Sequence, residues 1–132
     1  MIEVRGAVID GDRILLVREL TDGCWALPGG YADIGLSAAE NIVKEIREEA
    51  GLTVTAKALY SVTHKAKGLY RPDIRDFYKL YFLCERVDQL APAAGFETTE
   101  VGFFRLDDLP PLSLRPTIAT HLSAPFAFPS RQ

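Results

Sequence analysis

One stretch, Leu27 to Leu52, constrains the fold more than any other part of the chain. It begins with a Pro-Gly-Gly turn, and Ser37 followed by Glu40 three residues later forms the pattern of a helix-capping box. Gly51 stands where a left-handed C-terminal cap is expected. Apolar residues recur at four-residue spacing and predict a stripe that faces a core: Ile42, Ile46 and Ala50. We therefore predict one amphipathic helix between two glycine turns.

The other face of this helix is acidic. Three glutamates at three- and four-residue spacings bring their carboxylates to one side: Glu45, Glu48 and Glu49. Like charges repel, and a helix C-terminus disfavours anions, so a bound cation would stabilise this face. Oxygen ligands of this kind suit Mg²⁺ or Mn²⁺. A solvated acidic surface is the alternative, but the Gly-Gly turn at a fixed distance upstream favours the cation site.

Together, the turn, the glutamates and the closing glycine resemble the Nudix box, the signature of the Nudix hydrolases. Gly30 supplies the first glycine of that pattern, and most of the rest is present: Glu45, Ile46, Glu48, Glu49, Gly51 and Leu52. Two positions depart from it, since Leu36 replaces the first glutamate and Lys44 replaces the arginine. Lysine keeps the positive charge but lacks the planar fork of arginine. We expect these departures to lower activity or alter metal preference without abolishing function; Asp33 either compensates in part or only caps its loop.

The resemblance implies a site built on the acidic helix face. Glu45, Glu48 and Glu49, together with the backbone carbonyl of Gly30 or its neighbour, are the implied ligands of Mg²⁺ or Mn²⁺. The same three glutamates and Lys44 are the candidate catalytic residues, and one glutamate near the metal would act as general base. Lys44 lies four residues before Glu48, so it either orients that carboxylate or is simply exposed.

Outside the box, five residues are candidates for substrate binding. Trp25 could stack on a nucleobase or could pack beside the turn. Tyr70 and Arg71 lie in a polar loop after the box, where some Nudix families carry substrate-selecting residues. Glu97 and Glu100 precede a strand and either reach the metals from a loop or remain exposed carboxylates.

Hydrophobic patterning predicts strands on both sides of the helix. The expected strands are residues 2–9 and 13–18, joined as a hairpin, then 52–62, 75–86 and 100–105. The segment 75–86 is too apolar and aromatic for an exposed strand, so we place it centrally. A last helix is expected at 116–122. This order predicts an α+β fold with a mixed β-sheet between helices, which agrees with the α/β/α sandwich that the resemblance implies.

Composition narrows the class of protein. With 132 residues, the chain is expected to be a single domain spanning 1–132. Its net charge of −3 and lack of a basic run argue against binding of extended nucleic acid. Capped RNA ends are not excluded as substrates, because they need only a small pocket. No apolar run approaches the roughly 20 residues of a membrane span, and no leader is visible. Two isolated cysteines, Cys24 and Cys84, favour reduced thiols, and we expect a cytoplasmic protein.

A finer resemblance concerns the substrate. The segments GGYADIGLSAAENIVKE and ETTEVGFFRLDDLPPLS are similar to a bacterial Nudix subgroup that includes CDP-choline and UDP-sugar type pyrophosphatases. That subgroup also carries Leu at the position of Leu36. Many of its members have an additional N-terminal helical domain, and we expect this chain to lack that domain. No proline lies at the spacing typical of ADP-ribose pyrophosphatases, which disfavours that substrate.

The function that this resemblance implies is metal-dependent hydrolysis of a pyrophosphate bond. The substrate would be a nucleoside diphosphate linked to another moiety, and the products a nucleoside monophosphate and a phosphorylated compound. Two alternatives are a house-cleaning pyrophosphatase of nucleoside triphosphates and a weakly active Nudix module that senses a nucleotide. The aromatic tail Phe126-Ala127-Phe128 is expected to pack onto its own domain or onto a second copy in a homodimer.

Overall fold

The computed structural model describes residues 1–65, 77–113 and 118–127. Its strands are β1 (Ile2–Asp10), β2 (Arg13–Glu19), β3 (Trp25–Ala26), β4 (Gly29–Tyr31), β5 (Val54–Lys65), β6 (Phe77–Arg86) and β7 (Thr98–Arg105). Its helices are α1 (Ala38–Ala50), α2 (Ile118–Ser123) and a 3₁₀ turn, η1 (Ala124–Ala127). No helix in these ranges is long and apolar enough to cross a membrane.

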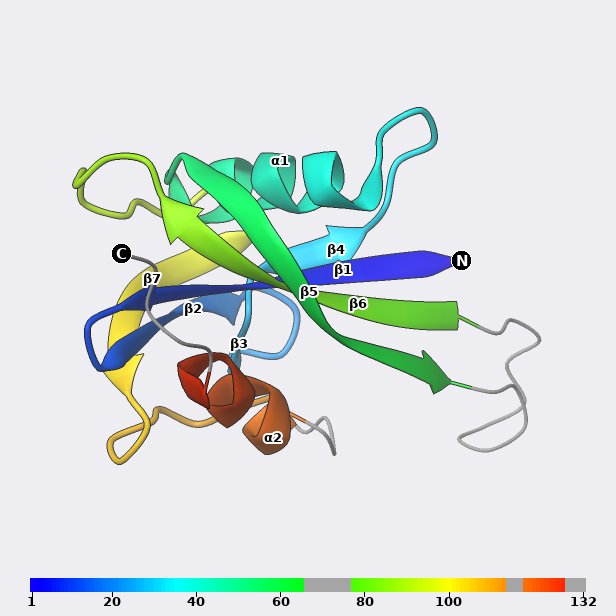
Figure 1. The fold of residues 1–132 in the computed structure, drawn as a ribbon. Helices are drawn as coiled ribbons and strands as arrows, with labels where there is room; N and C mark the ends of the chain where they lie inside the picture. The colour runs from blue at the N-terminus through cyan, green and yellow to red at the C-terminus, as the bar shows by residue number, and fades with distance from the viewer. Residues whose placement is uncertain (66–76, 114–117, 128–132) are drawn as a thin grey trace.

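The strands form one mixed sheet around β1. Along its main path the order is β3-β2-β1-β6-β5, while β4 pairs with β1 and β7 pairs with β2. β1 and β6 are parallel, and the other pairs are antiparallel. Figure 1 shows α1 on one face of the sheet and α2 with η1 on the other. The α+β fold with a mixed sheet between helices is therefore confirmed.

Each face of the sheet carries its own core. On the α1 face, Ile42, Ile46 and Ala50 are fully buried against residues of the central strands that include Val4, Val8 and Phe82. On the opposite face, Leu122 of α2 packs with Ala7, Ile14, Leu16, Leu27 and Tyr81. The helical stripe read from the sequence is thus the surface that fixes α1 to the sheet, and this packing positions the acidic face of the helix.

Gly6 on β1 sets how closely α1 approaches the sheet. A Cβ atom at this position would lie 2.7 Å from Ile46 Cδ1 and 2.8 Å from Ile42 Cγ1. We expect Gly6→Ala to lower the free energy of unfolding by about 1–3 kcal/mol, because both isoleucines would have to shift. Chemical denaturation measures this. Gly102→Ala on β7 is the matched control, since a Cβ there would lie 3.4 Å from Phe104 Cε2. Equal losses in both variants would contradict the close packing at Gly6.

Most element boundaries agree with the sequence prediction. The hairpin forms with Asp10 opposite Arg13, and β6 lies between β1 and β5 as expected of a central strand. The pattern missed β3 and β4, because strands of two and three residues are too short to show a period. The described part of the last helix begins at Ile118, and Phe126 packs against the core of its own domain, whereas Phe128 lies outside the described residues.

Candidate functional site

The ends of α1 form as the sequence predicts. The Ser37 side chain accepts from the backbone N–H of Glu40 (3.1 Å), and Glu40 Oε1 accepts from the Ser37 N–H (2.8 Å). Gly51 adopts φ 70° and donates its N–H to Arg47 O at 3.0 Å. Because Gly51 can take this left-handed conformation without strain, α1 ends at Ala50, one residue after Glu49. The three glutamates therefore lie on the last turns of a well-defined helix.

These glutamates line a single cavity of about 540 Å³. Its described lining is completed by the loop that precedes β7: Gly95, Phe96 and Glu97. The loop lies directly against the C-terminal turn of α1, because a Cβ at Gly95 would come 1.9 Å from Glu48 O. The acidic face of the helix is thus closed on one side by a second segment that carries a further carboxylate. The structure brings Glu45, Glu48 and Glu49 together, as their helical spacing predicted, and adds Glu97, whose place the sequence had left open.

The Gly-Gly turn forms another wall of this site. The Gly29 N–H donates to Glu49 Oε1 at 3.4 Å, and a Cβ at Gly30 would lie 3.2 Å from Glu45 Oε1. A Cβ at Gly29 would lie 1.9 Å from Val4 O on the neighbouring strand. Gly29 is therefore required by its close approach to the backbone of β1, whereas a side chain at Gly30 would crowd the Glu45 carboxylate.

Glu49 is the least exposed of the three glutamates, at 7%. Burial raises its pKa to about 9, the hydrogen bond with Glu45 acts in the same direction, and the positive charge of Arg5 opposes both. A carboxyl of this kind holds a proton near neutral pH unless a cation replaces it. Glu45 and Glu49 therefore behave as a pair of carboxyl groups that share a site.

Arg5 on β1 contacts residues beside this site, and the sequence analysis did not identify it. Its Nε donates to Glu3 Oε2 (2.8 Å), and its Nη1 donates to Glu19 Oε1 (3.1 Å) and to Leu27 O (2.7 Å). Burial alone would lower the pKa of Arg5, but the carboxylates of Glu3 and Glu19 outweigh it and hold the pKa above its ordinary value. Arg5 thus ties β1 to the residues just before the Gly-Gly turn. Its position within the apolar run of the first strand was the signal that could have revealed it.

Lys44 links two acids on the rim. Its Nζ lies 2.9 Å from Asp33 Oδ2 and 3.3 Å from Glu48 Oε2, and these hydrogen bonds raise the pKa of the ammonium group. Leu36 does not line the carboxylate cavity; it lies in a shallow apolar groove between α1 and β5. Lys44 therefore has the orienting contact with Glu48 that the sequence left open, and Asp33 supplies its second acidic partner.

Asn41, which is fully buried, fixes the loop that carries Asp33. Its Oδ1 accepts from the Asp33 N–H (2.8 Å), and its Nδ2 donates to Ser37 O (2.9 Å). A buried amide that satisfies both neighbours stabilises the loop against α1. Sequence reasoning missed Asn41, because a single polar residue inside an amphipathic helix gives no sign that it faces inward.

Two other candidates, Trp25 and Glu100, are not part of the described cavity lining. Trp25 is half-buried and packs edge-on against Phe104, with ring centroids 4.9 Å apart. Glu100 is exposed and pairs with Arg18 (3.4 Å), outside the described cavity lining. Tyr70 and Arg71 lie outside the described residues.

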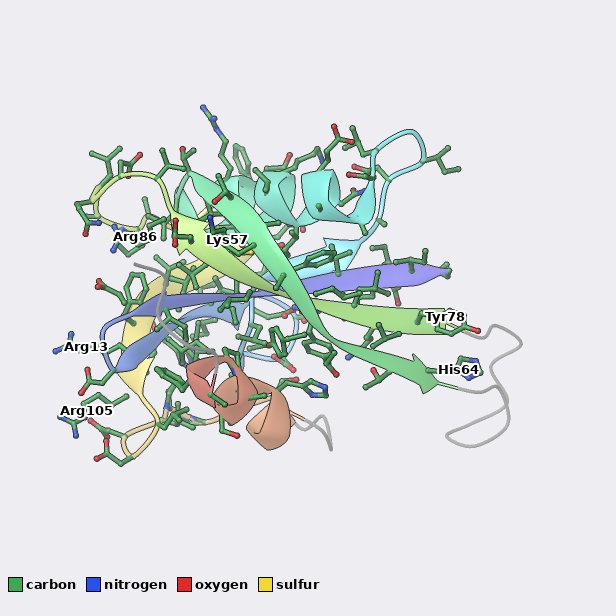
Figure 2. All side chains as sticks on the ribbon, in the orientation of Figure 1. Arg13, Lys57, His64, Tyr78, Arg86 and Arg105 are labelled. Atoms are coloured by element: carbon green, nitrogen blue, oxygen red, sulfur yellow. The ribbon has the colours of Figure 1, made fainter. Side chains whose placement is uncertain are left out.

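His64 is also remote from the acidic helix face. It stacks on Tyr78 with ring centroids 4.6 Å apart, and Figure 2 shows both residues at neighbouring ends of β5 and β6, away from α1. The carboxylates thus meet their partners on α1, the glycine turn and the loop before β7, and the imidazole of His64 lies elsewhere.

The sequence profile of the NUDIX domain matches residues 2–124. This chain belongs to the Nudix family. The family resemblance drawn from the Gly-Gly turn, the three glutamates and Gly51 is therefore confirmed.

Relatives and solved structures extend this result. A Bacillus subtilis protein named "Putative ADP-ribose pyrophosphatase YjhB" is 43% identical over 126 residues, which are 96% of this chain and 60% of that protein. An ADP-ribose pyrophosphatase of Methanocaldococcus jannaschii is 31% identical over 119 residues, covering 85% of this chain and 66% of the relative. This chain thus spans less than two thirds of the length of these curated relatives.

A crystal structure of an ADP-ribose pyrophosphatase from Streptococcus suis has a TM-score of 0.76 and 38% identity, covering 92% of this chain and 86% of that one. A structure described as a UDP-X diphosphatase has a TM-score of 0.79 and 29% identity, with 96% and 62% covered. Both likenesses support the Nudix fold for nearly the whole described chain.

The donor set of the cavity fits the divalent cation that Nudix hydrolases generally use. Carboxylate oxygens and a nearby backbone turn are hard ligands, and Gly30 leaves room beside Glu45. Within the described ranges, no three acidic, histidine or cysteine side chains already converge as a metal site does. Glu48 instead pairs with Lys44, and Glu45 hydrogen-bonds Glu49. Binding of a cation would therefore require Glu48 to exchange Lys44 for the metal and Glu49 to lose its proton.

Proposed function

We propose that this chain is a metal-dependent pyrophosphatase that hydrolyses a nucleoside diphosphate linked to another moiety, with Mg²⁺ or Mn²⁺ as cofactor. The products are a nucleoside monophosphate and a second phosphorylated compound. The observation that carries the proposal is the single cavity in which Glu45, Glu48 and Glu49 face the loop of Glu97, beside the Gly-Gly turn. Clustered carboxylates next to a glycine turn suit an ion that neutralises a diphosphate.

Different residues of the site bind the cation, accept a proton and position the ligands. Glu45, Glu48 and Glu49, with a carbonyl of the glycine turn, would hold the cation, which would neutralise phosphate charge and lower the pKa of a water. Glu97 lines the same cavity, and we infer that it accepts the proton of the attacking water. Lys44 and Asp33 position Glu48, while Arg5 holds the turn through Leu27 O. Catalysis then rests chiefly on positioning and electrostatics.

The relatives as well as the site guide which substrate class to test first. Proteins named as ADP-ribose pyrophosphatases match most of this chain, so ADP-ribose is the first substrate to test. This differs from the expectation based on the missing proline, which had disfavoured ADP-ribose. The similar structure described as a UDP-X diphosphatase makes nucleotide sugars the second choice.

A substrate panel tests the proposal directly. Purified protein is incubated with ADP-ribose, nucleotide sugars, CDP-alcohols and nucleoside triphosphates, each with Mg²⁺, with Mn²⁺ and with chelator. The proposal expects cation-dependent release of a nucleoside monophosphate from a linked diphosphate. Pyrophosphate release from triphosphates alone would favour the house-cleaning alternative. Tight binding without turnover of any compound would favour a sensing module.

Leu36→Glu restores the family residue at a position that the structure places away from the cavity. We expect turnover and the preference for Mg²⁺ over Mn²⁺ to stay within about twofold, since exposed substitutions outside a site have small effects. Lys44 already has Asp33 as a second acidic partner, so an added glutamate supplies nothing that is missing. Steady-state kinetics with both metals measures this. A large gain in turnover would show instead that Leu36 limits the enzyme.

A further inference from the structure

Phe96 is an exposed aromatic residue at the carboxylate cavity. Its side chain is fully exposed, at 104%, yet it lines the carboxylate cavity. Single exposed apolar residues are common on protein surfaces, so exposure by itself assigns no role. The position of the ring, on the rim of a cavity formed otherwise by acids and glycine, is what distinguishes it.

Hydrogen bonds hold the backbone before and after Phe96 in place. The Gly95 N–H donates to Thr98 Oγ1 (3.0 Å), whose hydroxyl donates to Glu49 O (2.9 Å). On the other side, Glu97 O accepts from the Leu20 N–H at 3.2 Å. In Figure 1 this loop, between β6 and β7, passes the end of α1. An aromatic ring whose backbone is already ordered costs a ligand less conformational entropy on binding.

Other described aromatic residues are less suited to this position. Trp25, the sequence-based candidate for stacking, is half-buried and packs edge-on against Phe104. Tyr60 and Tyr81 contact each other beneath α2, with Tyr81 buried in the core on the opposite face of the sheet. Phe96 is the described aromatic residue that lines the carboxylate cavity.

We propose that Phe96 is the surface on which the nucleobase of the substrate stacks while the diphosphate lies over the carboxylates. This inference rests on the proposed function. A nucleotide has a charged diphosphate at one end and a flat uncharged base at the other. The cavity has matching parts, because its carboxylates would hold a cation for the diphosphate and the exposed ring of Phe96 lies beside them for the base. Stacking reads the face of a base and not its hydrogen-bonding edge, so adenine, cytosine and uracil are all accommodated. Phe96 therefore supplies affinity for the base with little discrimination among bases.

The test compares Phe96→Ala and Phe96→Trp with the wild-type chain. Phe96→Ala should raise KM for a substrate such as ADP-ribose by about tenfold and leave kcat within about twofold, as expected for loss of one base stack. Phe96→Trp should keep KM at or below the wild-type value. Leu90→Ala is the matched control: it removes an exposed apolar residue from the same connection, outside the described cavity lining, and should change neither constant.

Two competing ligands separate base stacking from contacts with sugar or phosphate. AMP carries the base, whereas ribose 5-phosphate lacks it. Phe96→Ala should weaken inhibition by AMP about tenfold and leave inhibition by ribose 5-phosphate unchanged. Equal weakening of both, or of neither, would overturn the proposal. If wild-type protein hydrolyses nothing, the proposed function fails, and calorimetric binding of AMP to wild type and Phe96→Ala still decides the role of Phe96.

Discussion

Replacing Glu48 by glutamine is expected to lower kcat for the pyrophosphate substrate by on the order of 10³-fold. Glutamine keeps the size of the side chain but loses the negative charge that a divalent cation requires. The loss should fall on kcat and on the affinity for Mg²⁺, because the carboxylate acts through the metal. Measurement of turnover across a Mg²⁺ titration separates a weaker metal site, which high Mg²⁺ restores, from a loss of chemistry, which it does not.

The fold should survive this change. Glu48 is exposed, and its pair with Lys44 at 3.3 Å is a surface ion pair that contributes little to stability. Glu85→Gln is the matched control, since Glu85 is also an exposed carboxylate paired with a lysine, Lys57 at 3.6 Å, and lies on β6 outside the described cavity lining. Thermal unfolding of both variants should match the wild type. Wild-type turnover in Glu48→Gln would remove Glu48 from the site.

The parts of the site that were predictable from sequence are those fixed by local signals. The capping box, the apolar stripe and Gly51 define α1 within its own segment, and the helical period then places Glu45, Glu48 and Glu49 on one side. The mixed sheet followed in the same way from the apolar runs. These features depend on neighbours in the chain, so no tertiary information was needed.

The parts that were missed depend on contacts between distant segments. Arg5 meets Leu27 and Glu19 only because β1 pairs with both β2 and β4, which brings these distant segments together. Phe96 reaches the cavity because its loop packs on the end of α1, and the burial of Glu49 arises from the same meeting of helix, turn and loop. The sequence offered Glu48 and Glu49 as equivalent ligands. The structure separates them, since one is exposed and paired with Lys44 and the other is buried, which raises its pKa to about 9.

This difference leads to the second prediction of large effect, for Glu49→Gln. The variant should lose turnover, yet its metal-free form should be more stable than the wild type at pH 8, on the order of 2 kcal/mol. Glutamine resembles the protonated carboxyl: its oxygen can accept from the Gly29 N–H, and its amide can donate to Glu45. The substitution therefore keeps the contacts of the folded state and removes only the ionisation.

The raised pKa of Glu49 determines how the stability of the wild type changes with pH. The pKa of Glu49 rises from an ordinary value of 4.5 to about 9 on folding, so between these values the folded state retains a proton that the unfolded state has released. Wild-type stability must then fall as pH rises through this window, and the advantage of Glu49→Gln should shrink toward zero near pH 4.5. Urea denaturation with chelator at several pH values measures it. A constant difference between the two proteins would contradict the shift.

Adding Mg²⁺ should reverse the order of stability. The cation binds the folded wild-type site and stabilises it by mass action, while the site of Glu49→Gln has lost one ligand charge. Glu48→Gln is the control for the metal-free comparison, because an exposed carboxylate carries no burial cost to relieve. In this account the burial of Glu49 beside Glu45 lowers the stability of the metal-free fold at neutral pH, and the same burial places a carboxyl group where it can bind the cation once its proton is lost. Glu49 therefore lowers the stability of the metal-free fold and also contributes to binding of the cation.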